Sequence, residues 1–183
     1  MHAYDERWPT LYSAEAECLA KALGPDLAHL EHVGSTAVPG LDSHPTIDVV
    51  AAVSFREPPS VLAQRLRPIG FQIATQVGGA SPDRLVYAKG PHDPIRFRSY
   101  HLYVTEVDSS DWRRMIAFRD YLRDHPKSAL AYGELKRDLA HDFANQPRRY
   151  EDGRRPFIIA TERKAGFKVP GRGSAAREHS HWR

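Results

Sequence analysis

The sequence predicts an α/β protein in which helices flank a mixed β-sheet of about five strands. Residues Ile47–Val53 are nearly all apolar, with several β-branched side chains, which is typical of a central strand buried on both faces. Two later segments, Trp112–Leu122 and Leu130–Phe143, repeat apolar residues at helical spacing. Amphipathic helices of this kind pack against a sheet, so we expect layers of helix and sheet.

The remaining elements follow from helix-start and turn signals. Pro9 suits the first turn of a helix that ends at Gly24, and Gly70 closes a second helix that begins at two prolines. The loop 90–94 joins two strand candidates into an antiparallel hairpin, and Ser110 can cap the helix that follows. In chain order, the predicted elements are a helix at 9–23, strands at 27–33 and 47–53, a helix at 58–66, strands at 71–75, 85–89 and 97–105, and helices at 112–122 and 130–143.

Length and composition are typical of one domain with a short tail. The chain has 183 residues, of which 41% are hydrophobic, and this is enough to bury a core. We expect one domain over residues 1–168 and a flexible tail over 169–183, where Gly, Ser, Ala, Arg and His replace the apolar pattern. No apolar run approaches the roughly 20 residues of a membrane span and no signal pattern opens the chain, so we expect a cytoplasmic protein without a membrane partner.

Cysteine content and charge exclude some kinds of metal site and binding partner. Cys18 is the only cysteine, which excludes an intrachain disulfide and a Cys-rich metal site, and we expect it to pack on a helix. The formal net charge is +3, and part of this excess lies in the last third of the chain rather than in a compact stripe. Nucleic acid is therefore not an expected partner.

A glycine and a serine after the strand 27–33 are the centre of the candidate site. Gly34 lacks a Cβ, so its backbone can approach an oxyanion, while the Ser35 hydroxyl can bind phosphate or cap the next segment. Asp48 on the following strand can hold a divalent metal that bridges phosphates. Its alternative role is a structural hydrogen bond, because an unpaired buried carboxylate is costly. The arrangement is typical of a nucleoside triphosphate site, although Gly-Ser also occurs in ordinary turns.

Several motifs resemble the GrpB-like family of the nucleotidyltransferase superfamily. The signature is formed by residues 32–40, HVGSTAVPG, and 45–48, PTID. Matching segments outside it are Tyr4, Arg7-Trp8-Pro9, His101-Leu102-Tyr103-Val104, Tyr132-Gly133-Glu134-Leu135-Lys136, Tyr150, Gly153, Arg154 and Phe157-Ile158. The resemblance covers residues 4–165 and implies a nucleotidyltransferase-like sheet, with Gly34, Ser35 and Thr36 as ligand-binding residues.

The catalytic carboxylates of that superfamily are incomplete in this chain. Active members carry an acid-x-acid pair on the strand after Gly-Ser and a third acid on a later strand, which together bind two metal ions. Here the pair is Asp48 and Val50, and His101 stands where the third acid is sought. Asp48 remains the candidate catalytic residue, and His32 and His101 could join it in a Mg²⁺ or Mn²⁺ site. The alternative for both histidines is a hydrogen-bonded place in the core.

Two cationic side chains complete the candidate binding residues. Lys136 lies on the helix 130–143 and Arg98 on the hairpin, and each could reach phosphates held at Gly34. The alternatives are a solvated helix face for Lys136 and ordinary edge-strand charge for Arg98.

Two functions of different classes are consistent with these residues. The first is a nucleotidyltransferase-like protein that binds a nucleotide or another phosphorylated small molecule, with catalysis left open by the missing carboxylates. The second is a non-catalytic module that assists folding or binds a protein partner, because the resemblance extends to the domain fused to dephospho-coenzyme A kinase in some bacteria. The chain retains His32, Ser35, Asp48 and His101 together, which favours the ligand site.

Overall fold

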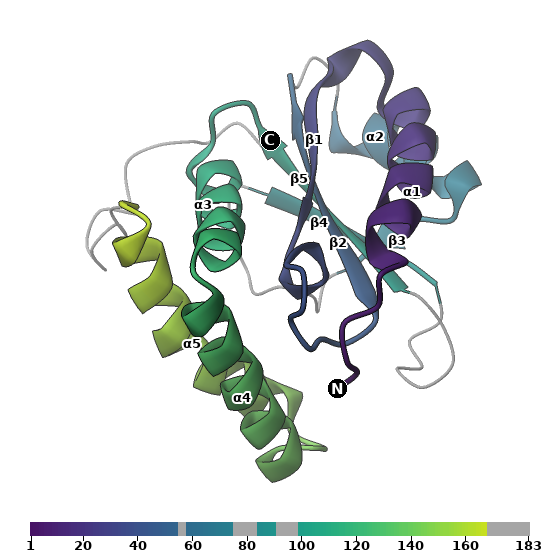
Figure 1. The fold of residues 1–183 in the computed structure, drawn as a ribbon. Helices are drawn as coiled ribbons and strands as arrows, with labels where there is room; N and C mark the ends of the chain where they lie inside the picture. The colour runs from purple at the N-terminus through teal and green to yellow at the C-terminus, as the bar shows by residue number, and fades with distance from the viewer. Residues whose placement is uncertain (55–57, 75–83, 91–98, 168–183) are drawn as a thin grey trace.

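The computed structural model describes residues 1–54, 58–74, 84–90 and 99–167. Within these ranges, five strands form one sheet in the order β1-β2-β5-β4-β3 (Figure 1). The strands are β1 Leu27–Val33, β2 Thr46–Val53, β3 Gln72–Ile73, β4 Arg84–Lys89 and β5 Ser99–Glu106. Strands β2 and β5 run parallel, and the other neighbours are antiparallel. The predicted α/β class with a mixed sheet of about five strands is therefore confirmed.

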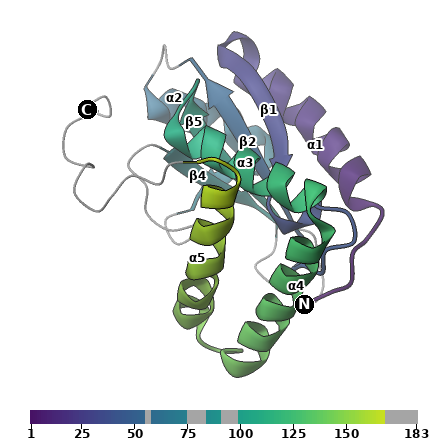
Figure 2. The ribbon, with the colours of Figure 1, turned by 60° about the vertical axis from the view of Figure 1, so that its left-hand side comes forward.

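Helices cover both faces of this sheet (Figures 1 and 2). They are α1 Trp8–Leu23, α2 Pro59–Leu66, α3 Ser110–Asp124, α4 Pro126–Asp142 and α5 Pro147–Lys164. Helices α1 and α2 contact each other on one face, and α3 packs on β1, β2 and β5 from the other. Helices α4 and α5 lie side by side and extend past the edge of the sheet in both views.

Alternation along β2 separates the hydrophobic core from the polar face of the sheet. Ile47, Val49 and Ala51 belong to the larger core cluster, which α1 and α2 cover. A smaller cluster forms between α3, α4 and the segment after β1, from Val38, Leu41, Leu122, Ala129 and Tyr132. Because successive strand residues point to opposite faces, Asp48 lies on the face that α3 covers.

Helix α5 is absent from the sequence prediction. It contains Gly153 and Pro156, which lower helix propensity, and its charged residues hide any apolar period. Phe157 and Ile158 nevertheless pack on the smaller hydrophobic cluster. Tertiary packing therefore stabilises a helix that its local sequence does not indicate.

Two further local predictions need correction. The N-cap of α3 is Ser109, whose hydroxyl accepts a hydrogen bond from the Trp112 backbone N–H at 3.1 Å, so Ser110 is already helical. Cys18 lies on α1 but is exposed, because it falls outside the buried stripe of Glu15, Leu19 and Leu23.

The other strand predictions hold over the residues that the structure describes. Residues 75, 97 and 98 of the predicted strands 71–75 and 97–105 lie outside those ranges. The first of these strands is short, with β3 limited to Gln72–Ile73. No helix among the described residues is long and apolar enough to cross a membrane.

Candidate functional site

Asp48 on β2 lies beside His101 on β5, because the two parallel strands pair with these residues in register. His101 Nδ1 is 3.2 Å from Asp48 Oδ1, and the Tyr103 hydroxyl donates to the same oxygen at 3.2 Å. Burial and the Asp48 charge raise the pKa of Tyr103 well above its usual value, so the phenol stays protonated and remains a donor. The Asp48 side chain is still 22% exposed, which leaves part of the carboxylate open to a ligand.

Gly34 carries the chain past the Asp48 carboxylate at the end of β1. Its φ of 72° and ψ of −171° lie in a region that is essentially restricted to glycine. A Cβ at this position would lie 2.3 Å from Asp48 Oδ2. The structure therefore brings Gly34 and Asp48 together, and both the backbone conformation and the contact require glycine.

Ser35 and Thr36 begin a short 3₁₀ helix, η2 Ser35–Ala37, directly after this turn. Thr36 is fully buried, and its hydroxyl donates to the Thr46 carbonyl at 3.0 Å. The same hydroxyl lies 3.0 Å from His32 Nε2. These contacts connect η2 to β1 and β2, so Thr36 stabilises the turn. Ser35, the first residue of η2, is half-buried.

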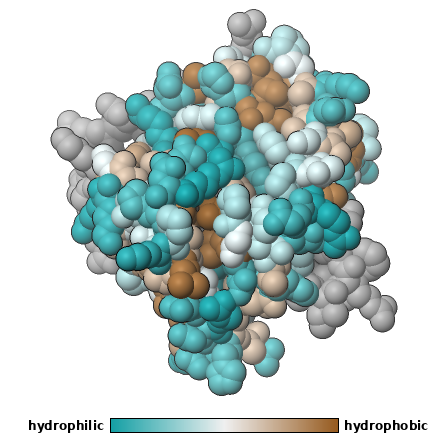
Figure 3. All heavy atoms as spheres, viewed as in Figure 1, coloured by the Kyte–Doolittle hydropathy of each residue, from teal (hydrophilic) through white to brown (hydrophobic). Residues whose placement is uncertain are grey.

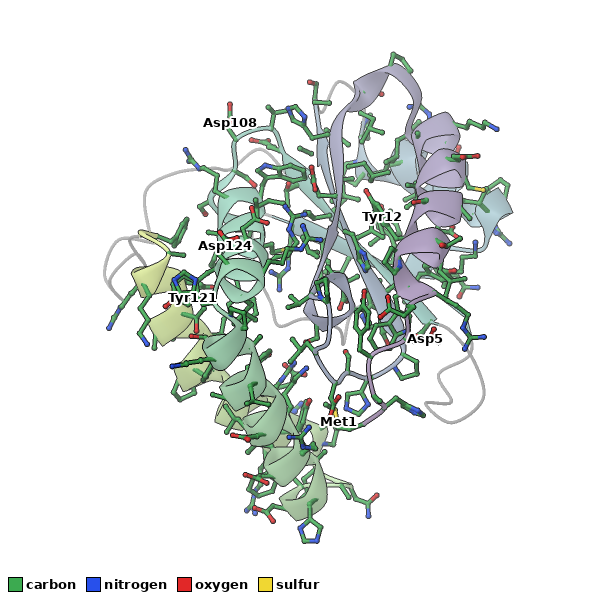
Figure 4. All side chains as sticks on the ribbon, viewed as in Figure 1. Met1, Asp5, Tyr12, Asp108, Tyr121 and Asp124 are labelled. Carbon is green, nitrogen blue, oxygen red and sulfur yellow. The ribbon has the colours of Figure 1, made fainter. Side chains whose placement is uncertain are left out.

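His32 lies on the opposite face of the sheet from Asp48. It pairs with Val49, one residue beyond Asp48, and neighbouring strand residues point to opposite faces. Its ring stacks on Tyr12 of α1 with 4.8 Å between centroids, and Figure 4 shows Tyr12 between α1 and the sheet. Burial lowers the pKa of His32 to about 4, so the ring is neutral near pH 7. In this structure, His32 is a hydrogen-bonded core residue.

The metal-binding group expected from Asp48, His32 and His101 is not assembled. Asp48 and His101 are bonded to each other, while His32 faces α1. Within the described ranges, no three His, Cys, Asp or Glu side chains are grouped so that they could hold a metal ion. Val50 shares the face of Asp48 but supplies no ligand. These residues alone therefore do not fit a divalent-metal site.

Lys136 is buried on α4, which excludes the alternative of a solvated helix face. The residue is only 1% exposed, and its Nζ donates to the Asp42 carbonyl at 2.5 Å. Burial and the nearby Arg154 lower the pKa of Lys136 to about 7, while Asp42 and Asp48 act in the opposite direction. Lys136 therefore lies close enough to Asp48 for their charges to interact. Arg98, the other predicted cation, lies outside the described residues.

Two arginines of α3 support the turn and are absent from the sequence prediction. Arg119 Nη1 donates to Glu31 Oε2 at 2.6 Å and to the His32 carbonyl at 2.8 Å. Arg123 Nε donates to the Ala37 carbonyl at 2.9 Å. These bonds fix α3 to β1 and η2. Their four-residue spacing was the available signal, although Arg123 lies one residue beyond the predicted helix 112–122.

Helix α5 brings a second unpredicted group of residues towards the loop 42–46. Arg154 Nη1 is 3.5 Å from the Tyr132 hydroxyl, and its guanidinium carbon lies 4.7 Å from the Tyr150 ring centroid. His44 in the loop meets Tyr150 edge to face, with 5.8 Å between ring centroids. Arg154 also pairs with Glu151. Tyr150 and Arg154 were visible only as parts of the family resemblance, because a helix was not predicted there.

An apolar pocket of about 570 Å³ lies beside η2 and α4. Its lining residues are Val38, Pro39, Gly40, Leu41, Asp42, Leu122, Arg123, Pro126, Ala129, Leu130, Gly133 and Arg137. Figure 3 shows hydrophobic side chains exposed among hydrophilic ones on this side of the molecule. Leu130 is one of the exposed residues, at 61%.

The fold and this site define an α/β protein with a mixed sheet, in which a glycine turn meets a hydrogen-bonded carboxylate near the start of the interior strand β2. The chain belongs to the GrpB family, whose model, described as GrpB protein, matches residues 1–164. The crystal structure of the conserved protein GrpB from Enterococcus faecalis is similar, with a TM-score of 0.78 and 30% sequence identity. That match covers 89% of this chain and 94% of the other.

The chain is also similar in sequence to curated proteins from other bacteria. The chain is 33% identical over 175 residues to a UPF0157 protein of Pseudomonas aeruginosa. The aligned region covers 96% of this chain and 67% of the relative. It is 30% identical over 172 residues to UPF0157 protein YqkA of Bacillus subtilis, covering 94% of this chain and 48% of YqkA. The chain therefore spans about half the length of that relative.

A weaker structural similarity connects the chain to the Cid1 poly(U) polymerase. The TM-score is 0.45 with 15% identity, over 75% of this chain and 42% of the other. A similarity of this extent carries no information about the activity of this chain.

Proposed function

We propose that this chain binds a nucleotide or another phosphorylated small molecule where Gly34, Ser35 and Asp48 meet. The observation that carries the proposal is the contact between Gly34 and Asp48. This contact holds the partly exposed Asp48 carboxylate against the backbone of Gly34, which has no side chain. The charge of this carboxylate favours the protonated form of Lys136. A ligand with both hydroxyl and phosphate groups suits such a site, because it offers donors to Asp48 and anionic groups to the cation.

Asp48 is the central binding residue in this proposal. Its Oδ1 is occupied by Tyr103 and His101, which orient the carboxylate. A ligand hydroxyl, such as that of a ribose, would then donate to the exposed part of the group. Nucleotidyl transfer is not part of the proposal, because the partner position on β2 is Val50.

The test is a thermal-shift panel of nucleotides and coenzyme A precursors, each with and without Mg²⁺ or Mn²⁺. A ligand that binds only the native state raises the melting midpoint by mass action. The matched variants are Asp48→Asn and Asp138→Asn, since Asp138 is exposed on α4. We expect at least one phosphorylated ligand to raise the midpoint of the wild type and of Asp138→Asn but to have much less effect on Asp48→Asn.

Metal dependence is a separate arm of the same panel. A midpoint increase that requires Mg²⁺ and disappears in Asp48→Asn would support the metal expected from the sequence, with further ligands supplied by the phosphates. The proposal fails if no member of the panel binds and Asp48→Asn only lowers the midpoint of the free protein. That result would favour the alternative of a non-catalytic folding or interaction module.

A further inference from the structure

A group of cationic and aromatic side chains lies between α4, α5 and the loop 42–46. Lys136 Nζ lies 4.8 Å from the Tyr132 ring centroid, and Arg154 bonds to the hydroxyl of the same tyrosine. Arg154 also covers the ring of Tyr150, which meets His44 of the loop. Two helices and one loop therefore converge on a single polar region, in which Tyr150 and Arg154 are partly buried.

Two buried polar atoms of this region have no hydrogen-bond partner among the described residues. They are the Tyr150 hydroxyl oxygen and Arg154 Nε. Burial raises the pKa of Tyr150, so its hydroxyl keeps the proton that it could donate. Buried donors without acceptors are rare in proteins, because each loses its hydrogen bond to water. Both atoms are donors, so an anionic oxygen would satisfy them.

Three groups that can carry positive charge, Lys136, Arg154 and His44, also lie close together in this region. Burial lowers the pKa of Lys136, and Arg154 lowers it further. Burial likewise lowers the pKa of His44 to about 4, with contributions from Arg154 and Lys136. Glu151 pairs with Arg154, and its side chain is 57% exposed. A bound anion would favour the protonated form of Lys136.

We propose that Lys136, Arg154 and Tyr150 form a phosphate subsite that binds the polyphosphate of a nucleoside diphosphate or triphosphate. This subsite rests on the proposed function, and it adds the part of the ligand that Gly34 and Asp48 do not bind. The guanidinium and the phenol supply donors directed at phosphate oxygens, and Lys136 supplies a point charge. Glu151 provides the acidic boundary of the subsite on the solvent side.

The loop 42–46, whose His44 contacts Tyr150, leads directly into β2 and so connects the subsite to Asp48. The charge of Asp48 influences Lys136, and the charges of Asp48 and Glu151 both influence Tyr103. A ligand could therefore place its sugar at Asp48 and its phosphates between α4 and α5.

Isothermal titration of the full chain with inorganic tripolyphosphate tests the subsite without a nucleoside. The sharpest variant is Tyr150→Phe, because it removes only a hydroxyl that has no partner in the described structure. We expect its affinity for tripolyphosphate to fall by about five- to tenfold. The melting midpoint of the free protein should stay equal or rise, since an unsatisfied buried group is lost. The control is Tyr87→Phe, which removes another buried hydroxyl without a described partner, on β4 in the larger core cluster.

Two charge variants extend the test. Arg154→Gln and Lys136→Met should each weaken tripolyphosphate binding by about tenfold or more. Their controls are Arg148→Gln on α5 and Lys127→Met on α4, because both residues are exposed. Unchanged affinity in Tyr150→Phe, with Arg154→Gln still folded and still binding, would overturn the subsite. Equal losses in the control variants would also overturn it, because they would indicate general charge attraction.

The outcomes separate the subsite from the proposed function. If nucleotides raise the melting midpoint through Asp48 but tripolyphosphate does not bind, the subsite is wrong and the proposed function survives. If tripolyphosphate binds and Tyr150→Phe weakens it while Asp48→Asn has no effect on any nucleotide, the subsite is supported and the proposed role of Asp48 is wrong.

Discussion

Gly34 and Asp48 are in direct contact, so that a Cβ on Gly34 would lie 2.3 Å from Asp48 Oδ2. The contact joins the end of β1 to the start of the antiparallel β2, where Val33 and Asp48 are paired. A carboxylate packed against backbone in this way is held in one orientation, and His101 and Tyr103 donate to its other oxygen. The geometry of the candidate site therefore depends on a residue that has no side chain.

Gly34→Ala is expected to destabilise the protein by more than about 3 kcal/mol, because backbone strain and the collision with Asp48 add together. Gly24→Ala is the matched control. Gly24 has a similar backbone conformation, with φ 63° and ψ −143°, but a Cβ there would meet nothing within 4 Å. Gly24→Ala should lower the free energy of unfolding by only about 1–3 kcal/mol, as expected for backbone strain alone. Chemical denaturation measures both, and equal costs would show that the Asp48 contact is unimportant.

His32 is expected to make the protein less stable in acid. The unfolded ring binds a proton below about pH 6.5, but the folded ring only below about pH 4, so the unfolded state holds more protons between these values. Stability therefore falls as the pH decreases through this window, and His32 should account for about 2 kcal/mol of the loss down to pH 5. His32→Gln keeps a polar group for Thr36 and should reduce the loss, as measured by urea denaturation. An equally steep loss in the variant would contradict the buried neutral imidazole.

Lys136 is expected to act in the same direction at higher pH, where stability should rise as the pH increases. Its pKa is about 7 in the folded state and 10.5 in the reference state, so the unfolded chain binds more protons between these values. Stability should rise by up to about 2 kcal/mol from pH 7 to pH 9 through this group. Lys136→Met should abolish that rise, whereas Lys127→Met on the exposed side of α4 should retain it. A rise that persists in Lys136→Met would mean that another group causes it.

The sheet could be predicted because its strands carry local signals. Ile47–Val53 is an apolar run, and β4 and β5 flank a loop with glycine and prolines. Helix α5 has no such signal, since Gly153 and Pro156 interrupt it. Gly153 instead serves packing, because a Cβ there would lie 2.5 Å from Leu139 Cδ2 on α4. This reason exists only in the folded state, so sequence patterns cannot contain it.

The candidate site was predictable in part for the same reason. Gly34 and Asp48 occur in a recognisable motif, and the structure places them together. The side of the sheet that His32 faces depends on its register with Val49, which the sequence does not specify. The burial of Lys136 depends on the loop 42–46 and on α5, which are distant in sequence. Charged residues on a helix are usually solvated, so its residue type indicated the wrong environment.

The most direct test of the ligand site uses the two histidines on opposite faces of the sheet. His101 is bonded to Asp48, whereas His32 stacks on Tyr12 under α1. Nitrogen-15 NMR of the histidine rings during titration with ATP reports on both residues in the unmodified protein. The account predicts that the His101 ring signals shift in proportion to occupancy while those of His32 stay almost unchanged. Shifts of His32 without His101, or no shift of either at ATP concentrations that raise the melting midpoint, would contradict a ligand site at Asp48.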